Sequence, residues 1–486
     1  MRLPRDSEIT LARRLVLVVG LAYLAAQLLA FSLDRPPSWD EAIYLSQITP
    51  EAEALPFVPS RARGITFLAL PVLQLGGSLS LLRLFLAAAS TAALIGAFRT
   101  WVPVVGVGAV AAALLFAGSW PVLFYGSELM PNLWMALTGV AATAVLARRL
   151  ADRESRYDEL VAGGLVAVAA LIRPLDAVVL TAVLVLLPIV VRRATVSWTV
   201  HLALGLVAGW APWLVEMTAR AGSPGKAFAA AARLGHTGRL SLFENVRQYL
   251  ALSDGPSIGP VADPDVPLSG LLWLIGFVVL VILGVQASSR RGFLLSLMAA
   301  MAAGIALATG YIVLTDAQAP RFLLPALALL SVPAGLGLAT IVAGIGSRDR
   351  ADGVRFAGRV VASILVIVWT VAQVRIAARV EAGVTGQRGS AQRAGLEVRS
   401  LAAGEPCQVF SEASFPIVGF AAGCRAAPLG KVLAAWKHRS DPVERHERRV
   451  FLVLHRTRPI VAPEGTTLLG EIPSQGELRW YVYGER

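Results

Sequence analysis

The stretch 15-LVLVVGLAYLAAQLLAF-31, followed by 36-PPSWDEAIY-44, decides the fold of this chain. The first segment is apolar and long enough to cross a bilayer as one helix. It is longer than a signal-peptide core and no small-residue cleavage site follows it, so we expect it to be retained. The acids Asp40 and Glu41 come directly after it. The order of these pieces predicts carboxylate chemistry at a membrane surface.

Composition extends this interpretation to most of the chain. Of 486 residues, 56% are hydrophobic and only 16% are charged, whereas soluble proteins carry about 25% charged residues. Apolar stretches recur and predict a polytopic α-helical membrane protein with about eleven spans. The expected spans are residues 15–31, 80–98, 102–119, 128–147, 159–174, 176–191, 198–217, 270–287, 292–314, 321–345 and 355–376.

The basic residues indicate the orientation in the membrane. The net charge of +12 comes largely from arginines in short loops, which favours the positive-inside pattern over nucleic-acid binding. Arg13 and Arg14 precede the first span. They predict that the protein lies in the cytoplasmic membrane with its N-terminus on the cytoplasmic side. Loops 32–78 and 218–269 are then outside. Within the first, residues 65–75 are short for a span and predict an interfacial helix.

An odd number of spans places the tail outside as well. We expect a membrane domain over residues 1–376 and a small extracytoplasmic α/β domain over residues 377–486. Its expected helix is 387–401, and its expected strands are 408–411, 449–454, 466–472 and 478–483. Both cysteines of the chain, Cys407 and Cys424, lie here. An oxidising exterior favours a disulfide between them; the alternative is two buried thiols.

Several ionisable residues fall on the outer side of this topology. They are Asp40, Glu41, Glu128, Arg173, Asp176, Asp316 and Arg321. Ionisable groups beside lipid are costly unless paired or hydrated, which makes them functional candidates. A carboxylate can accept the proton of an attacking hydroxyl, and an arginine can bind a departing phosphate. This combination fits sugar transfer from a lipid phosphate.

Six short motifs then carry a resemblance to a known family. They are 39-WDEAIY-44, the run from Arg63-Gly64 to Pro71, 82-LRL-84, 127-SELMP-131, 171-LIRP-174 and 320-PRFLLP-325. In this order the chain resembles GT-C glycosyltransferases, closest to bacterial relatives of protein mannosyltransferases and aminoarabinose transferases. The resemblance implies an inverting enzyme with a polyprenyl-phosphate sugar donor and an acceptor that is a glycan, lipid or protein.

The resemblance also implies roles for individual residues. Asp40 would be the general base, and Glu41 would orient the acceptor or help to hold a divalent cation, Mg or Mn. Arg321 would bind the donor phosphate, with Arg173 and Arg63 as further contacts. Glu128, Tyr44 and Asp316 would line the acceptor cavity, and a cation, if used, would lie among Asp40, Glu41 and Glu128. Many relatives carry His-Pro-Pro where this chain has 60-SRARG-64, so Arg61 or Arg63 would replace that element.

Simpler interpretations stand beside these. Asp40 and Glu41 would suit the N-terminus of a helix, and Glu128 would suit the start of its own span. Arg173 would reach the surface as a snorkelling side chain, and Arg321 would pair with Asp316. At the level of the whole chain, the alternatives are a transporter or flippase of lipid-linked sugars and a non-catalytic cell-envelope binding protein.

Overall fold

The structure is a computed structural model. It describes residues 5–49, 55, 61–234, 242–255, 258–259, 263–313, 315, 318–345, 352–412, 414–429, 449–459, 466–474 and 476–485. The chain forms two compact units. The helical unit comprises residues 1–31, 59–64 and 83–380, and the mixed unit comprises residues 32–58, 65–82 and 381–486. The expected division of the chain at residue 376 stays a prediction.

Every expected span coincides with a helix in the described part of the chain. These helices are α1 (Asp6–Ala30), α4 (Leu79–Val105), α5 (Val107–Ala117), α7 (Pro131–Leu150), α8 (Asp158–Ile172), α9 (Pro174–Val190), α10 (Val196–Ala221), α13 (Leu268–Arg291), α14 (Leu294–Val313), α15 (Leu324–Ile345) and α16 (Asp352–Ala402). Seven of the apolar helices are long enough to cross a membrane. The count of about eleven crossings is therefore not confirmed.

Shorter helices join these spans. They are α6 (Trp120–Tyr125), α11 (Pro224–Leu234), α12 (Leu242–Ala251), η2 (Leu252–Asp254) and η3 (Pro320–Leu323) in the helical unit, with η1 (Arg63–Ile65) at its border. Three of them, α11, α12 and η2, lie in the expected outer loop 218–269, and η3 precedes α15 directly.

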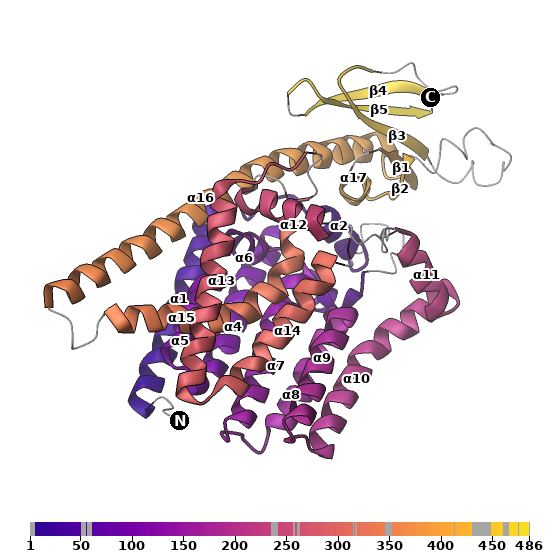
Figure 1. Cartoon of the computed structure of the whole chain (residues 1–486). Coiled ribbons are helices and arrows are strands. Elements are labelled where there is room, and N and C mark those ends of the chain that lie inside the picture. The colour runs from indigo at the N-terminus through magenta and orange to yellow at the C-terminus, as the bar shows by residue number, and fades with distance from the viewer. Residues whose placement is uncertain are drawn as a thin grey trace. The chain divides into compact units, whose positions relative to one another are not determined.

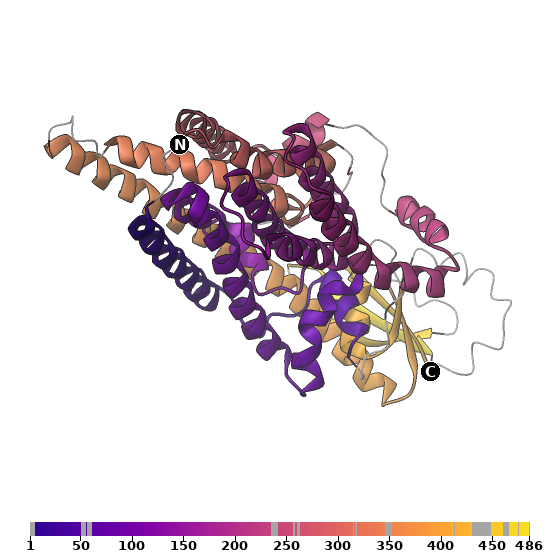
Figure 2. The same ribbon diagram turned by 90° about the horizontal axis from the view of Figure 1, so that it is seen from below.

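Burial separates inner from outer helices within the helical unit. The apolar window of α7 is 83% buried, whereas that of α13 is 11% and that of α1 is 22% buried. In Figures 1 and 2, α1 (indigo) lies at the edge of the helical unit. A helix with an apolar but exposed surface suits contact with lipid chains.

Small residues let neighbouring helices of the helical unit approach closely. A Cβ atom at Gly205 of α10 would lie 2.1 Å from the carbonyl oxygen of Gly163 in α8. One at Gly337 of α15 would lie 2.0 Å from the carbonyl oxygen of Leu280 in α13. Such glycine contacts are typical of packed membrane helices. They also explain why α8 and α10 run side by side in Figure 1.

The mixed unit is built on a five-stranded sheet. Its strands are β1 (Cys407–Ser411), β2 (Arg425–Pro428), β3 (Arg449–Arg456), β4 (Thr466–Pro473) and β5 (Arg479–Glu485), in the order β2-β1-β3-β5-β4. Strand β1 pairs in parallel with β2 and β3, and β5 pairs antiparallel with β3 and β4. The unit also contains α2 (Trp39–Ser46), α3 (Thr66–Gln74) and α17 (Phe415–Ala422). Strand β2 and α17 were not expected from the sequence.

The C-terminal part of α16 supplies one face of this unit's core. Ala391, Ala394 and Val398 pack with Val409 of β1 and Trp480 of β5. The expected helix 387–401 is thus the last part of a single helix of 51 residues, which is drawn in orange in Figure 1.

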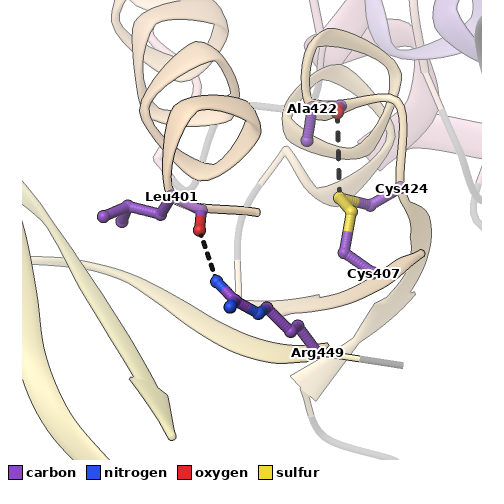
Figure 3. Close-up of a disulfide and its surroundings, with 5 residues drawn as sticks. All are labelled: Leu401, Cys407, Ala422, Cys424 and Arg449. Carbon is purple, nitrogen blue, oxygen red and sulfur yellow. Dashed lines mark hydrogen bonds between the residues drawn. A yellow bond between two sulfur atoms is a disulfide. The ribbon is translucent and has the colours of Figure 1, made fainter. Parts of the chain in front are cut away.

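A disulfide joins Cys407, at the start of β1, to Cys424, directly before β2 (Figure 3). The two Cα atoms are 5.0 Å apart. Beside it, Nη1 of Arg449 donates a 2.9 Å hydrogen bond to the carbonyl oxygen of Leu401 at the end of α16 (Figure 3). The disulfide closes the segment that connects β1 to β2 and contains α17. Arg449 connects the sheet to α16.

Candidate active site

Asp40 lies in the first turn of α2, whose N-terminus is capped by two reciprocal hydrogen bonds between Ser38 and Glu41. The Ser38 hydroxyl accepts a hydrogen bond from the backbone N–H of Glu41, and Oε2 of Glu41 accepts one of 2.8 Å from the N–H of Ser38. This reciprocal pair is a capping box. Glu41 is fully buried, whereas Asp40 is half-buried. A carboxylate in the first turn of a helix interacts favourably with the helix dipole.

A buried ion pair holds the segment that leads into α2. Arg35 is fully buried and pairs with Glu381 at the start of the mixed unit's part of α16. Glu381 Oε1 also accepts hydrogen bonds from the N–H of Ser32 and the hydroxyl of Thr385, at 3.3 and 3.2 Å. The linker before Asp40 is therefore attached to α16 through an ion pair and a hydrogen bond.

Trp39 and Tyr44 attach α2 itself. The Trp39 ring packs edge-to-face against Phe415 of α17, with centroids 4.8 Å apart. Tyr44 is buried within the mixed unit. Because α2 is anchored on α17 next to Asp40, this carboxylate has a defined position within its own unit.

In the helical unit, Arg173 and Arg321 belong to one aromatic cluster. Arg173, at the α8–α9 break, pairs with Asp176 at 3.0 Å and lies 5.7 Å from the Tyr311 ring centroid. Tyr311 stacks on Phe322, with centroids 5.5 Å apart, and the Arg321 guanidinium lies 4.9 Å from the Phe322 centroid. Each of the two stacked rings is therefore in contact with one guanidinium group, Tyr311 with that of Arg173 and Phe322 with that of Arg321.

Asp176 fixes the Tyr311 end of this cluster. The Tyr311 hydroxyl donates to the Asp176 carboxylate, at 2.7 and 2.8 Å to its two oxygens, and Arg173 contacts the same hydroxyl. Asp176 is buried. Asp176 pairs with Arg173, and the guanidinium groups of Arg173 and Arg321 both belong to this cluster. Guanidinium groups are suited to binding an anion such as phosphate.

Helix α12 brings a tyrosine to the Arg321 side. Burial raises the pKa of Tyr249, and the positive charge of Arg321 acts in the opposite direction. The Tyr249 hydroxyl is buried and has no hydrogen-bond partner among the described residues. It therefore stays protonated and is available to donate to a ligand. Asn245 attaches α12 through hydrogen bonds to the carbonyl oxygens of Ile312 and Thr315.

Arg63 lies at the border of the helical unit. Its Nε is 2.8 Å from Oε1 of Glu216 in α10, which also pairs with Arg220. A Cβ atom at the following Gly64 would lie 2.0 Å from the carbonyl oxygen of Leu171. Only glycine allows this contact, which places Arg63 beside the C-terminal end of α8. Arg173 follows directly after that end.

Glu128 is fully buried between α6 and α7. Fully buried Arg83 of α4 donates a 3.0 Å hydrogen bond to the carbonyl oxygen of Ser127, directly before it. Met130 occupies the N-cap position of α7, so Glu128 does not cap that helix. The structure thus buries Glu128 directly before the start of this span.

The expected site residues are divided between the two units. Asp40, Glu41 and Tyr44 lie in the mixed unit, and Arg63, Glu128, Arg173 and Arg321 lie in the helical unit. Convergence of these two groups stays a prediction. Asp316 lies outside the described residues. Within the described ranges, no three His, Cys, Asp or Glu side chains are grouped to hold a metal ion, and Glu41 is committed to its cap.

Comparison with known proteins identifies the fold. No family model and no curated protein sequence matches the chain. Among solved structures, it is similar to the aminoarabinose transferase ArnT of Cupriavidus metallidurans bound to undecaprenyl phosphate, with a TM-score of 0.64 and 14% identity over 96% of this chain and 97% of ArnT.

A second similar structure is the oligosaccharyltransferase AglB of Archaeoglobus fulgidus, in complex with an inhibitory peptide and dolichol phosphate. The TM-score is 0.56, with 13% identity over 90% of this chain and 69% of AglB. At such identities the likeness establishes the fold alone. The GT-C fold expected from the sequence is therefore confirmed, and the chain is a multi-pass membrane protein.

Proposed function

We propose that this protein is an inverting membrane glycosyltransferase that moves a sugar from a polyprenyl-phosphate donor to an acceptor outside the cytoplasmic membrane. The observation that carries the proposal is the Arg173–Tyr311–Phe322–Arg321 cluster in a chain whose fold matches ArnT over nearly its whole length. The ArnT structure contains undecaprenyl phosphate.

In the proposed reaction, the Asp40 carboxylate accepts the proton of an acceptor hydroxyl. The hydroxyl oxygen forms a bond to the anomeric carbon of the donor sugar, on the face opposite the phosphate. The bond between that carbon and the phosphate oxygen breaks, and its electron pair leaves with polyprenyl phosphate. Proton removal during the attack raises the nucleophilicity of the oxygen.

We assign Arg321 and Arg173 to the donor phosphate, which gains negative charge as it leaves. Fixed guanidinium groups stabilise such charge without reorganisation. Tyr249 supplies a neutral donor beside Arg321. Arg63, held by Glu216, is a secondary contact of the same phosphate. We assign Glu128 and Tyr44 to the acceptor cavity and Glu41 to the positioning of α2. The reaction is written without a cation.

The test is consumption of polyprenyl-phosphate sugars by the purified full chain in detergent. Asp40→Asn should lose nearly all turnover, because the amide cannot accept the proton. Asp34→Asn is a matched control: it removes the same charge from the same segment, at an exposed residue that bonds the Ser80 hydroxyl, and should keep turnover. Equal consumption by Asp40→Asn and wild type would remove Asp40 from the mechanism. Transport of the intact donor across vesicles without its consumption would favour a flippase.

A further inference from the structure

A cavity of about 300 Å³ opens within the mixed unit, apart from every residue assigned above. Its walls come from α16, α17 and the chain on either side of α2. The lining residues are Pro37, Thr49, Gln392, Leu396, Arg399, Ile417, Phe420 and Ala421. This volume is at the lower end of ligand sites in proteins, roughly 300–1,000 Å³, and suits one or two sugar rings.

The cavity is formed by two helix faces. Gln392, Leu396 and Arg399 are spaced to lie on one face of α16, and Ile417, Phe420 and Ala421 on one face of α17. Leu396 is 48% exposed, although it lies on the helix that packs against the sheet. Together, Leu396, Ile417 and Phe420 offer an apolar surface of the kind on which sugar rings pack.

Three polar side chains accompany this surface. Gln392, Thr49 and Arg399 line the cavity, and none of them makes a side-chain hydrogen bond or ion pair with another residue in the described ranges. An amide, a hydroxyl and a guanidinium can bind hydroxyl groups and one anionic group. Arg399 is exposed at the rim, where a guanidinium favours a carboxylate or phosphate.

The cavity lies close to the proposed base. Pro37, which lines it, is three residues before Asp40, so their Cα atoms are at most about 11 Å apart. Trp39, between them, packs on Phe415 of α17. All of these residues belong to the mixed unit. A ligand bound in the cavity therefore lies at a defined distance from Asp40.

We propose that this cavity is an acceptor subsite that binds an anionic sugar unit, such as a uronic acid or a sugar phosphate, with its ring on Phe420 and its anion on Arg399. The proposal rests on the glycosyltransferase function above. It assigns a substrate class to the acceptor: a glycan or glycolipid with a negatively charged residue near the hydroxyl that receives the sugar.

The test is saturation-transfer NMR on the full chain in detergent, with D-galacturonic acid, glucose 6-phosphate and the neutral sugar galactose as probes. Wild type should bind the anionic probes more tightly than galactose. Arg399→Gln should weaken the anionic probes about tenfold, the loss expected for one charge-assisted hydrogen bond, and leave galactose unchanged. Arg425→Gln, which removes an exposed charge from β2 of the same unit, should change nothing.

Ala421→Phe provides a second variant, because its ring would fill the cavity and should abolish binding of all three probes. An unchanged anionic preference in Arg399→Gln, or unchanged binding in Ala421→Phe, would overturn the proposal, as would absence of binding to wild type. These assays need no donor. Loss of the subsite is therefore distinguishable from failure of the glycosyltransferase function, which Asp40-dependent donor consumption reports.

Discussion

The rings of Phe322 and Tyr311 stack almost parallel, with an interplanar angle of 8° and centroids 5.5 Å apart. Phe322 carries the Arg321 guanidinium on its ring, and Tyr311 lies beside that of Arg173. Two arginines that are far apart in the sequence thus belong to one cluster. Cation–π contacts restrain both side chains, which lowers the entropy lost when an anion binds.

Arg321→Gln should therefore raise the KM for the polyprenyl-phosphate sugar. Loss of a charge-assisted contact to phosphate costs about 1.5–3 kcal/mol, which corresponds to roughly a ten- to hundredfold change. Turnover should fall as well, because the leaving phosphate loses stabilisation. Initial rates of donor consumption at varied donor concentration measure both effects.

Arg220→Gln is the matched control for this variant. Arg220 pairs with Glu216 in the same unit, at 2.9 Å, and its side chain is 37% exposed. Its loss should leave the donor KM within about twofold, because Arg220 is assigned to no contact with the donor phosphate. If both variants raised the KM equally, the effect of Arg321 would be explained by the general positive charge of the unit and not by a specific contact with the phosphate.

Glu41→Gln should behave nearly as wild type, whereas Glu41→Ala should be destabilised. Glutamine at this position can still accept the hydrogen bond from the Ser38 N–H. Alanine leaves that buried donor unsatisfied, which costs about 1–3 kcal/mol. Thermal unfolding in detergent compares the two variants. A large loss of turnover in a stable Glu41→Gln protein would instead assign Glu41 to the acceptor or to a cation.

Much of the membrane part could be predicted from the sequence, because each apolar run long enough to cross a bilayer has one stable structure there. A helix is also found at the expected residues 65–75, as α3, and its location at the membrane interface stays a prediction. Strand β2 has only four residues, Arg425–Pro428, and no alternation strong enough to mark it. Helix α16 runs through the expected boundary at residue 376, since no proline or glycine interrupts the chain at that point.

The roles of the site residues stay predictions, but the arrangement of some of them can be compared with the sequence. Arg173 and Arg321 were expected to bind one phosphate, and the structure brings them into one cluster. The sequence does not single out Tyr311, because its stacking on Phe322 depends on the fold. The partnership of Arg35 with Glu381 joins residues 346 positions apart. No local pattern marks such a contact.

Glu381→Gln should destabilise the mixed unit strongly, because it removes the carboxylate with which the buried Arg35 pairs. Removal of one partner of a buried pair costs about 3–5 kcal/mol. Glu405→Gln is the control: Glu405 pairs with Arg449 where both side chains are about half exposed, at 56% and 49%, so its loss should cost less than about 1 kcal/mol. Thermal unfolding measures both.

The double variant Arg35→Met/Glu381→Leu separates stability from positioning. An apolar replacement of a buried pair is often neutral for stability, so this protein should unfold near the wild-type temperature. Its donor consumption should still be reduced, since the linker before Asp40 has lost its anchors at Ser32 and Arg35. Full turnover in the stable double variant would show that the ion pair does not position α2.

His455 should make the stability of the mixed unit depend on pH. Burial lowers the pKa of His455 below its ordinary value of 6.5, and the ring stacks on Trp480 with centroids 4.3 Å apart. Between the folded and unfolded pKa values, the unfolded chain binds more protons. Stability from this residue is therefore constant above pH 6.5 and falls as the pH decreases below it.

Thermal unfolding at pH 7.5 and 5.5 should show a decrease in stability for wild type that is smaller in His455→Gln. His201→Gln, at a histidine of α10 in the other unit, should keep the wild-type decrease; an equal decrease in His455→Gln would assign the pH dependence to other groups.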